Sequence, residues 1–133
     1  MRNRDLIEKF PEGISLQVFV RDRLYFQSSG KWLYPLFDLE EEIKVRPIAL
    51  SKAIVRDKVI GKAAALFLIH LGAWHVHGEL MSELAVKVFK SNHIHYSFGS
   101  CVPRIKCKTE ELLLEINDPG VAYKILSERA NRC

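Results

Sequence analysis

The chain has 133 residues, enough for one hydrophobic core, and its 48% hydrophobic and 27% charged residues are typical of a globular protein. No apolar run reaches the roughly 18 residues of a membrane span, and the N-terminus lacks the apolar segment of a secretory signal. We therefore expect a cytoplasmic protein without membrane contact. The net charge of +4 comes from scattered Lys and Arg, which argues against nucleic acid as a partner.

The first third of the chain predicts a helix, a β-hairpin and a second helix. Residues 4–10 fit a short helix. Apolar residues alternate over 14–21, a tight turn follows at 22–23, and residues 24–27 complete the hairpin. Apolar residues then recur at helical spacing over 33–43, with acidic side chains on the opposite face.

A nearly continuous apolar stretch in the middle of the chain predicts the helix around which the rest packs. Between residues 63 and 71 only His70 is polar, so we expect this helix inside the fold. Residues 48–56 lead into it, and we predict a helix over 57–71. Its start is polar and can bind an anion, because the first amide N–H groups of a helix lack partners. The polar residues at this start are Asp57, Lys58, Gly61 and Lys62.

Strands and helices alternate in the second half, after Gly72 as the C-cap of the central helix. This alternation predicts parallel strands joined by helical crossovers. The predicted strands are 73–78, 93–98 and 101–107, and the predicted helices are 83–90, 109–116 and 121–132. Asp118 and Pro119 are a typical N-cap and first-turn residue for the last helix.

The Gly61-Lys62 pair does not belong to a phosphate-binding P-loop. Arg56 stands where that motif needs its first Gly, and Ala63 replaces the Ser or Thr. Lys62 and the free amides around Gly61 can still hold a phosphate or a carboxylate. The alternative is that Gly61 allows close approach of the helix to the sheet and that Lys62 is a solvated first-turn residue.

Cys107 is a candidate nucleophile. Arg104, Lys106 and Lys108 flank it just before a predicted helix, a setting that favours the thiolate form and also metal binding. The alternative is a small buried hydrophobe. An odd number of cysteines in a chain of this size indicates free thiols rather than a disulfide framework; the three are Cys101, Cys107 and Cys133.

Two His-x-His pairs, His75/His77 and His93/His95, fall in predicted strands, where each pair shares one face. If the strands are neighbours, four imidazoles converge on a patch able to bind Zn²⁺ or Ni²⁺. Solvated strand ends or a subunit contact explain the pairs more simply, so we predict no metal site.

Two stretches resemble a family. The runs DKVIGKAAALFLIHLGA and CKTEELLLEINDPGVAYKIL, with Ser82-Glu83 opening a helix between them, resemble a small family of uncharacterised bacterial and archaeal proteins with a cytidine-deaminase-like fold. The resemblance covers residues 14–126. It implies one α/β domain over residues 1–133 with three α/β/α layers. Its mixed sheet has about five strands, an antiparallel N-terminal hairpin followed by parallel strands, with helices on both faces.

Cytidine deaminases hold zinc with a His or Cys at the start of the central helix and two Cys at the start of the next active-site helix, and a Glu moves the protons. Residues 61–65 of this chain contain no His, Cys or Glu. Cys107 stands where the Cys pair should be, and Glu110 occupies the partner position. The resemblance therefore implies the deaminase fold without catalytic zinc, and we expect no cofactor.

Our first hypothesis is a pocket that binds a nucleotide-like or other anionic small molecule, with Asp57, Lys58, Gly61, Lys62, Ser82, Cys107 and Glu110 at the site. The second is an enzyme of another class, with Cys107 as nucleophile and Glu110 or Lys62 as proton carrier. The third is a structural domain that forms a homo-oligomer through its His-bearing strands and aromatics such as Trp32 and Trp74.

Overall fold

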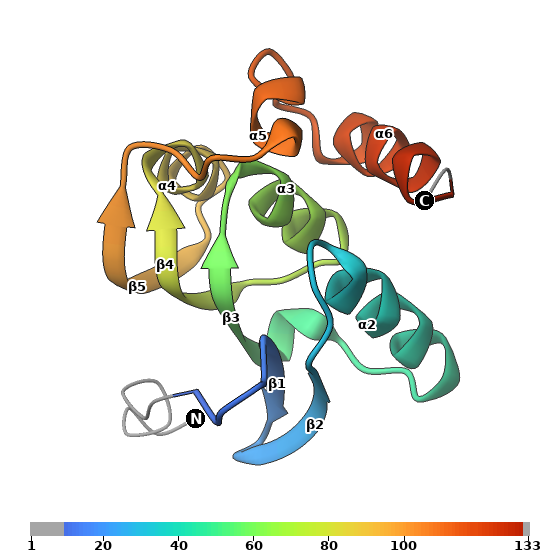
Figure 1. The fold of residues 1–133 in the computed structure, drawn as a ribbon. Coiled ribbons are helices and arrows are strands. Elements are labelled where there is room, and N and C mark those ends of the chain that lie inside the picture. The colour runs from blue at the N-terminus through green and yellow to red at the C-terminus, as the bar shows by residue number, and fades with distance from the viewer. Residues whose placement is uncertain (1–9, 132–133) are drawn as a thin grey trace.

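The structure is a computed structural model that describes residues 10–131, and a mixed five-stranded sheet forms its centre (Figure 1). The strand order is β2-β1-β3-β4-β5. β1 pairs antiparallel with β2 and with β3, whereas β3, β4 and β5 run parallel. This confirms the prediction of an antiparallel hairpin followed by parallel strands. The strands are β1 (Leu16–Val20), β2 (Arg23–Ser28), β3 (Ala53–Ile60), β4 (His75–Ser82) and β5 (His95–Val102).

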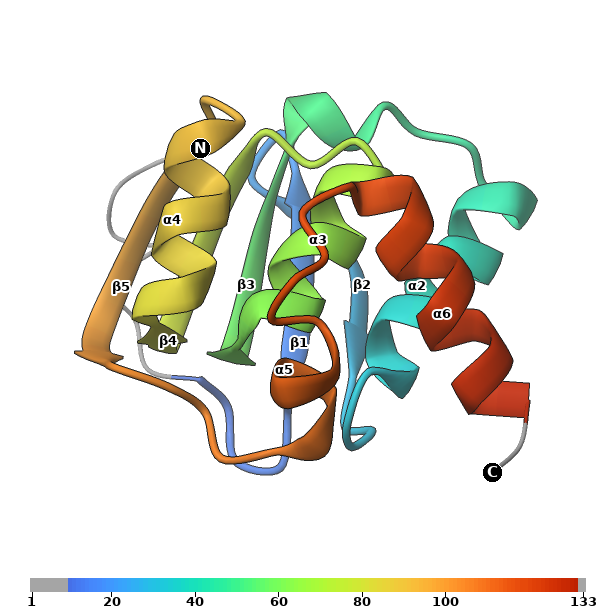
Figure 2. The same ribbon diagram turned by 90° about the horizontal axis from the view of Figure 1, so that it is seen from above.

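The described helices all lie on one side of this sheet (Figures 1 and 2). They are α2 (Tyr34–Val45), α3 (Lys62–His70), α4 (Glu83–Ser91), α5 (Lys108–Leu112) and α6 (Pro119–Asn131), with a short 3₁₀ turn η1 (Leu50–Lys52) before β3. The prediction of helices on both faces is therefore not met within residues 10–131. Two successive right-handed crossovers that advance in the same direction along a sheet place α3 and α4 on the same face. Of the predicted helix at 4–10, only Phe10 is described, and it is not helical.

The largest correction concerns residues 53–60. They form β3, the middle strand, so the central helix begins at Lys62 and not at Asp57. Apolar residues continue from this strand into the helix, which concealed the boundary at Gly61. The strand is rich in β-branched residues, which favour extended backbone: Ile54, Val55, Val59 and Ile60. Asp57 and Lys58 therefore belong to a strand and not to the first turn of a helix.

Other boundaries differ by smaller amounts. The hairpin turn consists of Arg21 and Asp22, one residue earlier than predicted. Both have positive φ, 51° and 66°, as a type I′ turn requires, so the hairpin forms without glycine. β4 continues to Ser82, and β5 ends at Val102, so residues 103–107 form a loop rather than the predicted strand. The predicted helix at 109–116 is shorter and begins at Lys108.

α3 is the buried centre that the sequence predicts. Every residue from Ala63 to Leu68 is at most 4% exposed, and the helix packs against α4 and α6. Leu71 is the C-cap of α3, and Gly72 follows it with φ of 96°, so the predicted glycine ends the helix one position beyond the cap. The Val121 N–H donates to Asp118 Oδ1 at 2.9 Å, which confirms the predicted cap of α6. No helix among residues 10–131 is long and apolar enough to cross a membrane.

Candidate functional site

The carboxylate of Glu110 occupies the start of α3. Its side chain is 1% exposed. Oε2 accepts hydrogen bonds from the Lys62 N–H at 2.6 Å and the Ser82 hydroxyl at 3.0 Å, and Oε1 accepts one from the Ile105 N–H at 2.6 Å. The N-cap residue of α3, Gly61, makes no side-chain cap. A carboxylate 48 positions later in the chain therefore satisfies an orphan amide and lies at the positive end of the helix dipole.

Gly61 makes room for this carboxylate. A Cβ atom at this position would lie 2.7 Å from Glu110 Oε2 and 3.4 Å from the Ile105 side chain. The φ of Gly61 is −96°, which other residues adopt, so the requirement comes from space and not from backbone conformation. The close neighbours of Gly61 therefore belong to the segment after β5. From the sequence we had considered that Gly61 allows close approach to the sheet instead.

Ser82 links three elements through one hydroxyl. Its Oγ accepts a hydrogen bond from the Ala85 N–H at 3.1 Å, which makes it the N-cap of α4, and donates to Glu110. The side chain is completely buried. This confirms the predicted helix start at Ser82-Glu83, and it joins the starts of α3 and α4 to the segment that contains α5.

The Lys62 side chain is buried as well, at 4% exposure, so the alternative of a solvated first-turn lysine is wrong. Its Nζ donates to the Leu114 carbonyl oxygen at 2.9 Å. Burial lowers the pKa of Lys62, and the carboxylates of Glu115 and Glu110 partly oppose this change. Lys62 therefore contacts the segment after β5 twice: its amide donates to Glu110 and its ammonium group donates to Leu114.

A pocket of about 250 Å³ opens beside Glu110, at the carboxyl end of β3. Its walls are mainly apolar and are supplied by Trp32, Leu33, Val59, Ala63, Ala64 and Ile105, while its other lining residues are Gly61, Lys62, Cys107, Thr109 and Glu110. The pocket therefore brings together four of the predicted site residues. The other three, Asp57, Lys58 and Ser82, do not line it.

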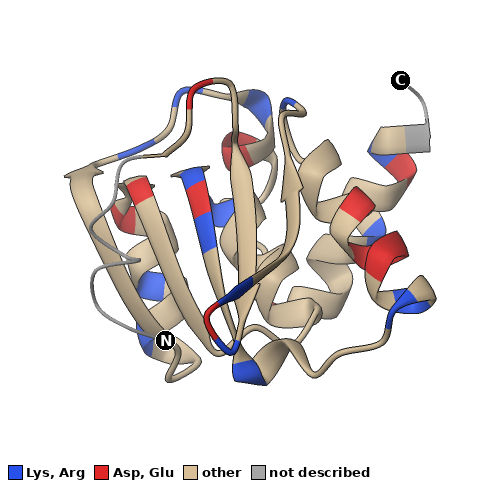
Figure 3. Ribbon diagram, turned by 90° about the horizontal axis from the view of Figure 1, so that it is seen from below, with Lys and Arg blue, Asp and Glu red and all other residues tan. Residues whose placement is uncertain are grey.

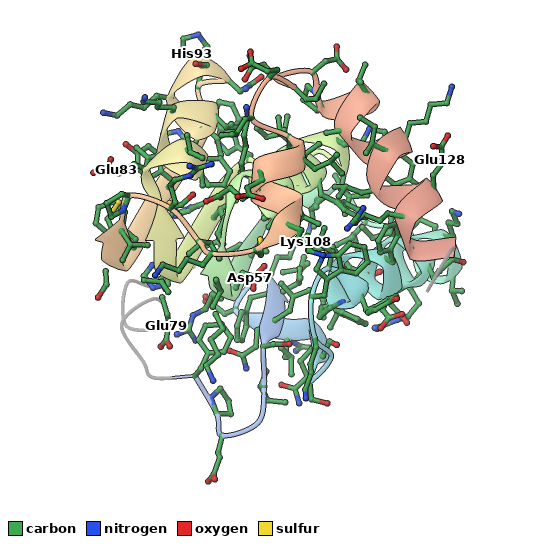
Figure 4. The ribbon with its side chains drawn as sticks, turned by 45° about the horizontal axis from the view of Figure 1, so that its top comes forward. Asp57, Glu79, Glu83, His93, Lys108 and Glu128 are labelled. Carbon is green, nitrogen blue, oxygen red and sulfur yellow. The ribbon has the colours of Figure 1, made fainter. Side chains whose placement is uncertain are left out.

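Asp57 and Lys58 differ in their surroundings. Lys58 is exposed. Asp57 is half-buried, and desolvation raises its pKa to about 7, although hydrogen bonds from the amides of Val59 and Lys58 act in the opposite direction. Figure 4 shows Asp57 on β3 and Lys108 at the start of α5, toward the same end of the sheet.

Cys107 lies at the rim of the pocket. It is exposed, so the alternative of a small buried hydrophobe is wrong. Its Sγ is 3.0 Å from Thr109 Oγ1, which is a hydroxyl and not a base, so this contact adds nothing to the nucleophile hypothesis. The segment 104–108, from the loop after β5 to the first residue of α5, carries exposed cations on both sides of Cys107 (Figure 3), namely Arg104, Lys106 and Lys108. A more open hollow of about 560 Å³ lies along this segment and shares Ile105 and Cys107 with the pocket.

The apolar wall of the pocket was not predicted from the sequence. Trp32 has a φ of 56°, a rare conformation for a bulky residue, and its ring packs edge-on against Tyr34 with centroids 5.1 Å apart. We had considered Trp32 only as an oligomer contact. The wall residues come from the loop before α2, from β3, from the first turn of α3 and from the loop after β5, so no short-range spacing could have grouped them all.

The two His-x-His pairs do not bring four imidazoles onto one strand face, the condition under which they could have formed a patch. His93 lies in a turn with φ of 57°, before β5 begins, so it does not share a strand face with His95. His75 and His95 are register partners with ring centroids 6.2 Å apart, and His77 Nδ1 is hydrogen-bonded to the Ser97 hydroxyl. Within residues 10–131, no three His, Cys, Asp or Glu residues are grouped to hold a metal ion.

Comparison with known proteins identifies the family. Residues 6–130 match the TM1506 family, described as a domain of unknown function, DUF1893. The chain belongs to the DUF1893 family. A crystal structure of a DUF1893 family protein, TM1506 from Thermotoga maritima, is similar, with a TM-score of 0.77 and 27% sequence identity over 87% of this chain and 80% of that chain. No curated protein matches the chain.

In this DUF1893 protein Cys107 lies directly before α5, as the N-cap residue of that helix. The sequence placed Cys107 just before a helix, so this local prediction is confirmed. The helix between α3 and α5 is α4, which begins with Ser82 as its cap.

Proposed function

We propose that this DUF1893 protein binds a nucleotide-like small molecule. A flat heteroaromatic ring enters the apolar pocket beside Glu110, and an anionic group lies along the cationic segment 104–108. The single observation that carries this proposal is the combination of an apolar pocket and one buried carboxylate in its wall. Ligand sites typically have this character, with mostly apolar walls and a few well-placed polar groups.

Glu110 has capacity for a ligand. A carboxylate accepts about four hydrogen bonds, and the described residues supply three. One acceptor position on Oε1 is left for a donor such as a ring N–H or an exocyclic amine. Such donors are found on the edges of nucleobases, and a buried acceptor selects for them strongly.

Trp32 supports the same site. A bulky residue with positive φ costs about 1 kcal/mol or more, and such strained residues cluster at ligand-binding sites. Its indole ring lines the pocket and is 38% exposed, so one face can stack on a planar ligand.

The place of the anionic group differs from our sequence-based hypothesis. We had placed it at the start of α3, but Glu110 already supplies a negative charge there. A second anion at that position would be repelled by the Glu110 carboxylate. We therefore place the phosphate or carboxylate of the ligand on Arg104, Lys106 and Lys108, which are exposed beside the pocket.

Isothermal titration calorimetry with nucleosides and their monophosphates tests the proposal. Val59→Trp fills the pocket from a side chain that is 42% exposed, and we expect it to weaken binding at least about tenfold. Val121→Trp on α6, where Val121 is 47% exposed, is the matched control and should bind as wild type. Absence of saturable binding by every nucleoside and nucleotide, or equal binding by both variants, would refute the proposal.

A second pair of variants tests the cationic segment. Lys106→Ala should weaken the binding of a monophosphate several-fold and leave the nucleoside unchanged, because it removes one phosphate contact. Lys90→Ala on α4 removes the same charge away from the pocket and serves as control. A nucleoside and its monophosphate that bind with equal affinity to wild type would exclude a role of segment 104–108.

We also infer a cytidine-deaminase-like fold that lacks deaminase zinc chemistry. The antiparallel hairpin followed by parallel strands supports the fold. The starts of α3 and α4, Gly61-Lys62 and Ser82-Glu83, contain no thiol or imidazole ligand. We expect no release of ammonia from cytidine or cytosine nucleotides after addition of Zn²⁺, and measurable release would overturn this inference.

A second candidate function, assembly of two copies, is favoured by the edge strand β5. β5 has eight residues without Asp, Glu, Lys, Arg or Pro, the residues that normally protect sheet edges. The opposite edge, β2, begins with Arg23 and pairs with β1 through an irregular register. On α4, which packs over β5, Glu83 lies at the start and Lys90 near the end, and both are exposed. Antiparallel pairing of two β5 strands therefore places opposite charges of two α4 helices toward one another.

Light scattering after size-exclusion chromatography tests this assembly. We expect wild type to be a dimer and Phe98→Lys to be a monomer, because Phe98 is 42% exposed on β5. Leu24→Lys places the same charge on β2, where Leu24 is 47% exposed, and should leave the dimer intact. A monomeric wild type at about 1 mM would refute β5 pairing.

A further inference from the structure

A second pocket lies on the other side of the start of α3. It has a volume of about 260 Å³ and is formed where α3 and α4 pack side by side (Figure 2), with the segment after α5 as its third wall. Its walls are more polar than those of the first pocket. The polar side chains around it are Lys62, Lys87, Ser91, Asn92 and Asn117.

Lys62 is the least exposed residue of these, at 4%. Its main-chain amide belongs to the Glu110 site, but its Nζ reaches Leu114, which also lines the second pocket. An ammonium has three N–H donors, and within residues 10–131 the acceptor is the Leu114 carbonyl oxygen alone. Burying a cation with incomplete hydrogen bonding is costly, so the remaining donors favour an acceptor in the pocket.

The other polar groups agree with an anionic occupant. Lys87 adds a second positive charge from α4, and among residues 10–131 no Asp or Glu lines the pocket. Of the carboxylates near Lys62, Glu115 has the larger effect on its pKa, which it raises. Glu115 is exposed, however, and does not line the pocket. The hydroxyl of Ser91 and the amide of Asn117 supply further donors, and Asn92, whose Nδ2 already donates to the Val88 carbonyl oxygen at 2.8 Å, has one amide hydrogen left.

We propose that this second pocket binds a phosphate group, with the Lys62 ammonium as its buried anchor and Lys87 as its second cation. A phosphate carries about −1.5 to −2 charges near pH 7 and presents several strong acceptor oxygens. Two lysines and three neutral donors match that charge and those acceptors. This site shares Lys62 with the pocket beside Glu110 but has its other lining residues to itself, and it does not depend on the function proposed for that pocket.

Inorganic phosphate and glycerol 3-phosphate are the probes, each titrated by calorimetry against chloride at matched ionic strength. We expect saturable binding, and a phosphate-dependent rise in melting temperature, because a ligand that binds only the folded state stabilises it. Lys87→Ala should weaken phosphate binding about tenfold, since it removes one charge-assisted hydrogen bond to the phosphate. Lys90→Ala, on the same helix but outside the pocket, should bind as wild type.

Two further variants keep the outcomes distinct. Lys62→Met should abolish phosphate binding, and circular dichroism will show whether this variant folds; Lys87→Ala decides the question if it does not. Val59→Trp should retain phosphate binding, which separates this site from the nucleotide pocket. Tighter binding of glycerol 3-phosphate than of phosphate indicates a phosphorylated metabolite, and the reverse indicates free phosphate. No saturable binding of either probe at about 10 mM, or equal binding by wild type and Lys87→Ala, overturns the proposal.

Discussion

At the scale of single residues, Glu110 behaves as an internal ligand of the protein. Three donors from three segments converge on its carboxylate, which is more than 95% buried. Helix N-termini commonly bind external anions, and here the chain supplies its own. We predicted that the polar start of α3 binds an anion, and in the structure the anionic group at this position is the side chain of Glu110.

Removal of this carboxylate should leave a cavity with three unpaired donors. We expect Glu110→Ala to lower the free energy of unfolding by about 3 kcal/mol, because buried donors without partners are costly. Acetate or formate at high concentration should restore part of this loss, since a small carboxylate can occupy the vacated position. Urea unfolding in acetate and in chloride measures the effect.

Glu111→Ala is the control for this experiment, because Glu111 is adjacent and exposed. It should change stability by less than about 0.5 kcal/mol, as surface substitutions usually do. Equal stabilisation of both variants by acetate would show a general salt effect and no carboxylate site.

Asp57 should make stability depend on pH. Its pKa is raised to about 7 by burial, whereas an aspartate in an unfolded chain has a pKa of about 3.9. The folded state therefore binds the proton of the Asp57 carboxyl group more tightly than the unfolded state does. The stabilisation from this proton is full below about pH 4 and is lost as the pH rises to about 7. Compared with Asp57→Asn, wild type should lose stability over this window.

The comparison with Asp57→Asn is needed because two histidines act in the opposite direction. Burial lowers the pKa values of His75 and His77, so their protonation destabilises the fold as the pH falls below about 6.5. Both proteins share this effect, which cancels in the difference between their unfolding free energies. A difference that does not change between pH 4 and 7 would contradict a raised pKa of Asp57.

At the scale of elements, the starts of α3 and α4 are joined to each other through Ser82 and Glu110. We expect Ser82→Ala to cost about 2 kcal/mol, the sum of a lost N-cap and a lost hydrogen bond to a carboxylate. Ser91→Ala, at the exposed end of the same helix, should cost far less. Chemical denaturation compares the two, and equal losses would show that the Ser82 hydroxyl has no special role.

Short-range patterns predicted most of these elements. Alternation found the β1–β2 hairpin, and helical spacing with caps found α2, α4 and α6, because those signals lie within a few neighbouring residues. Residues 57–60 of β3 were assigned to the central helix and residues 53–56 to the segment before it, since a short apolar run does not distinguish a buried strand from a buried helix. The β-branched composition of β3 and the Gly61 boundary were the available signals.

The candidate site was predictable only in part, because its residues are far apart in the sequence and short-range patterns do not connect them. Gly61, Lys62, Cys107 and Glu110 were grouped through a family resemblance, and the structure places all four at one pocket. Trp32, which lines the same pocket, carried no local signal that links it to residues 75 positions later. Which carboxylate reaches an amide 48 positions away depends on packing of the whole chain.

At the scale of the whole molecule, the segment 103–118 depends on elements that must form before it. α5 has five residues, too few to be stable alone. Its anchors are Ser82 and the amide and ammonium groups of Lys62, which are positioned only when β3, β4 and their helices have assembled. We therefore expect this segment to dock last during folding.

The same dependence makes segment 103–118 a separate cooperative unit in the native state. Native-state hydrogen exchange in low denaturant should show the Ile105 and Leu113 amides opening at a lower free energy than the Val55 amide of β3. Equal opening free energies would mean that the segment unfolds only with the sheet. Local opening of this unit withdraws Glu110 from α3, so the polar start of the central helix is exposed to solvent for brief intervals without global unfolding.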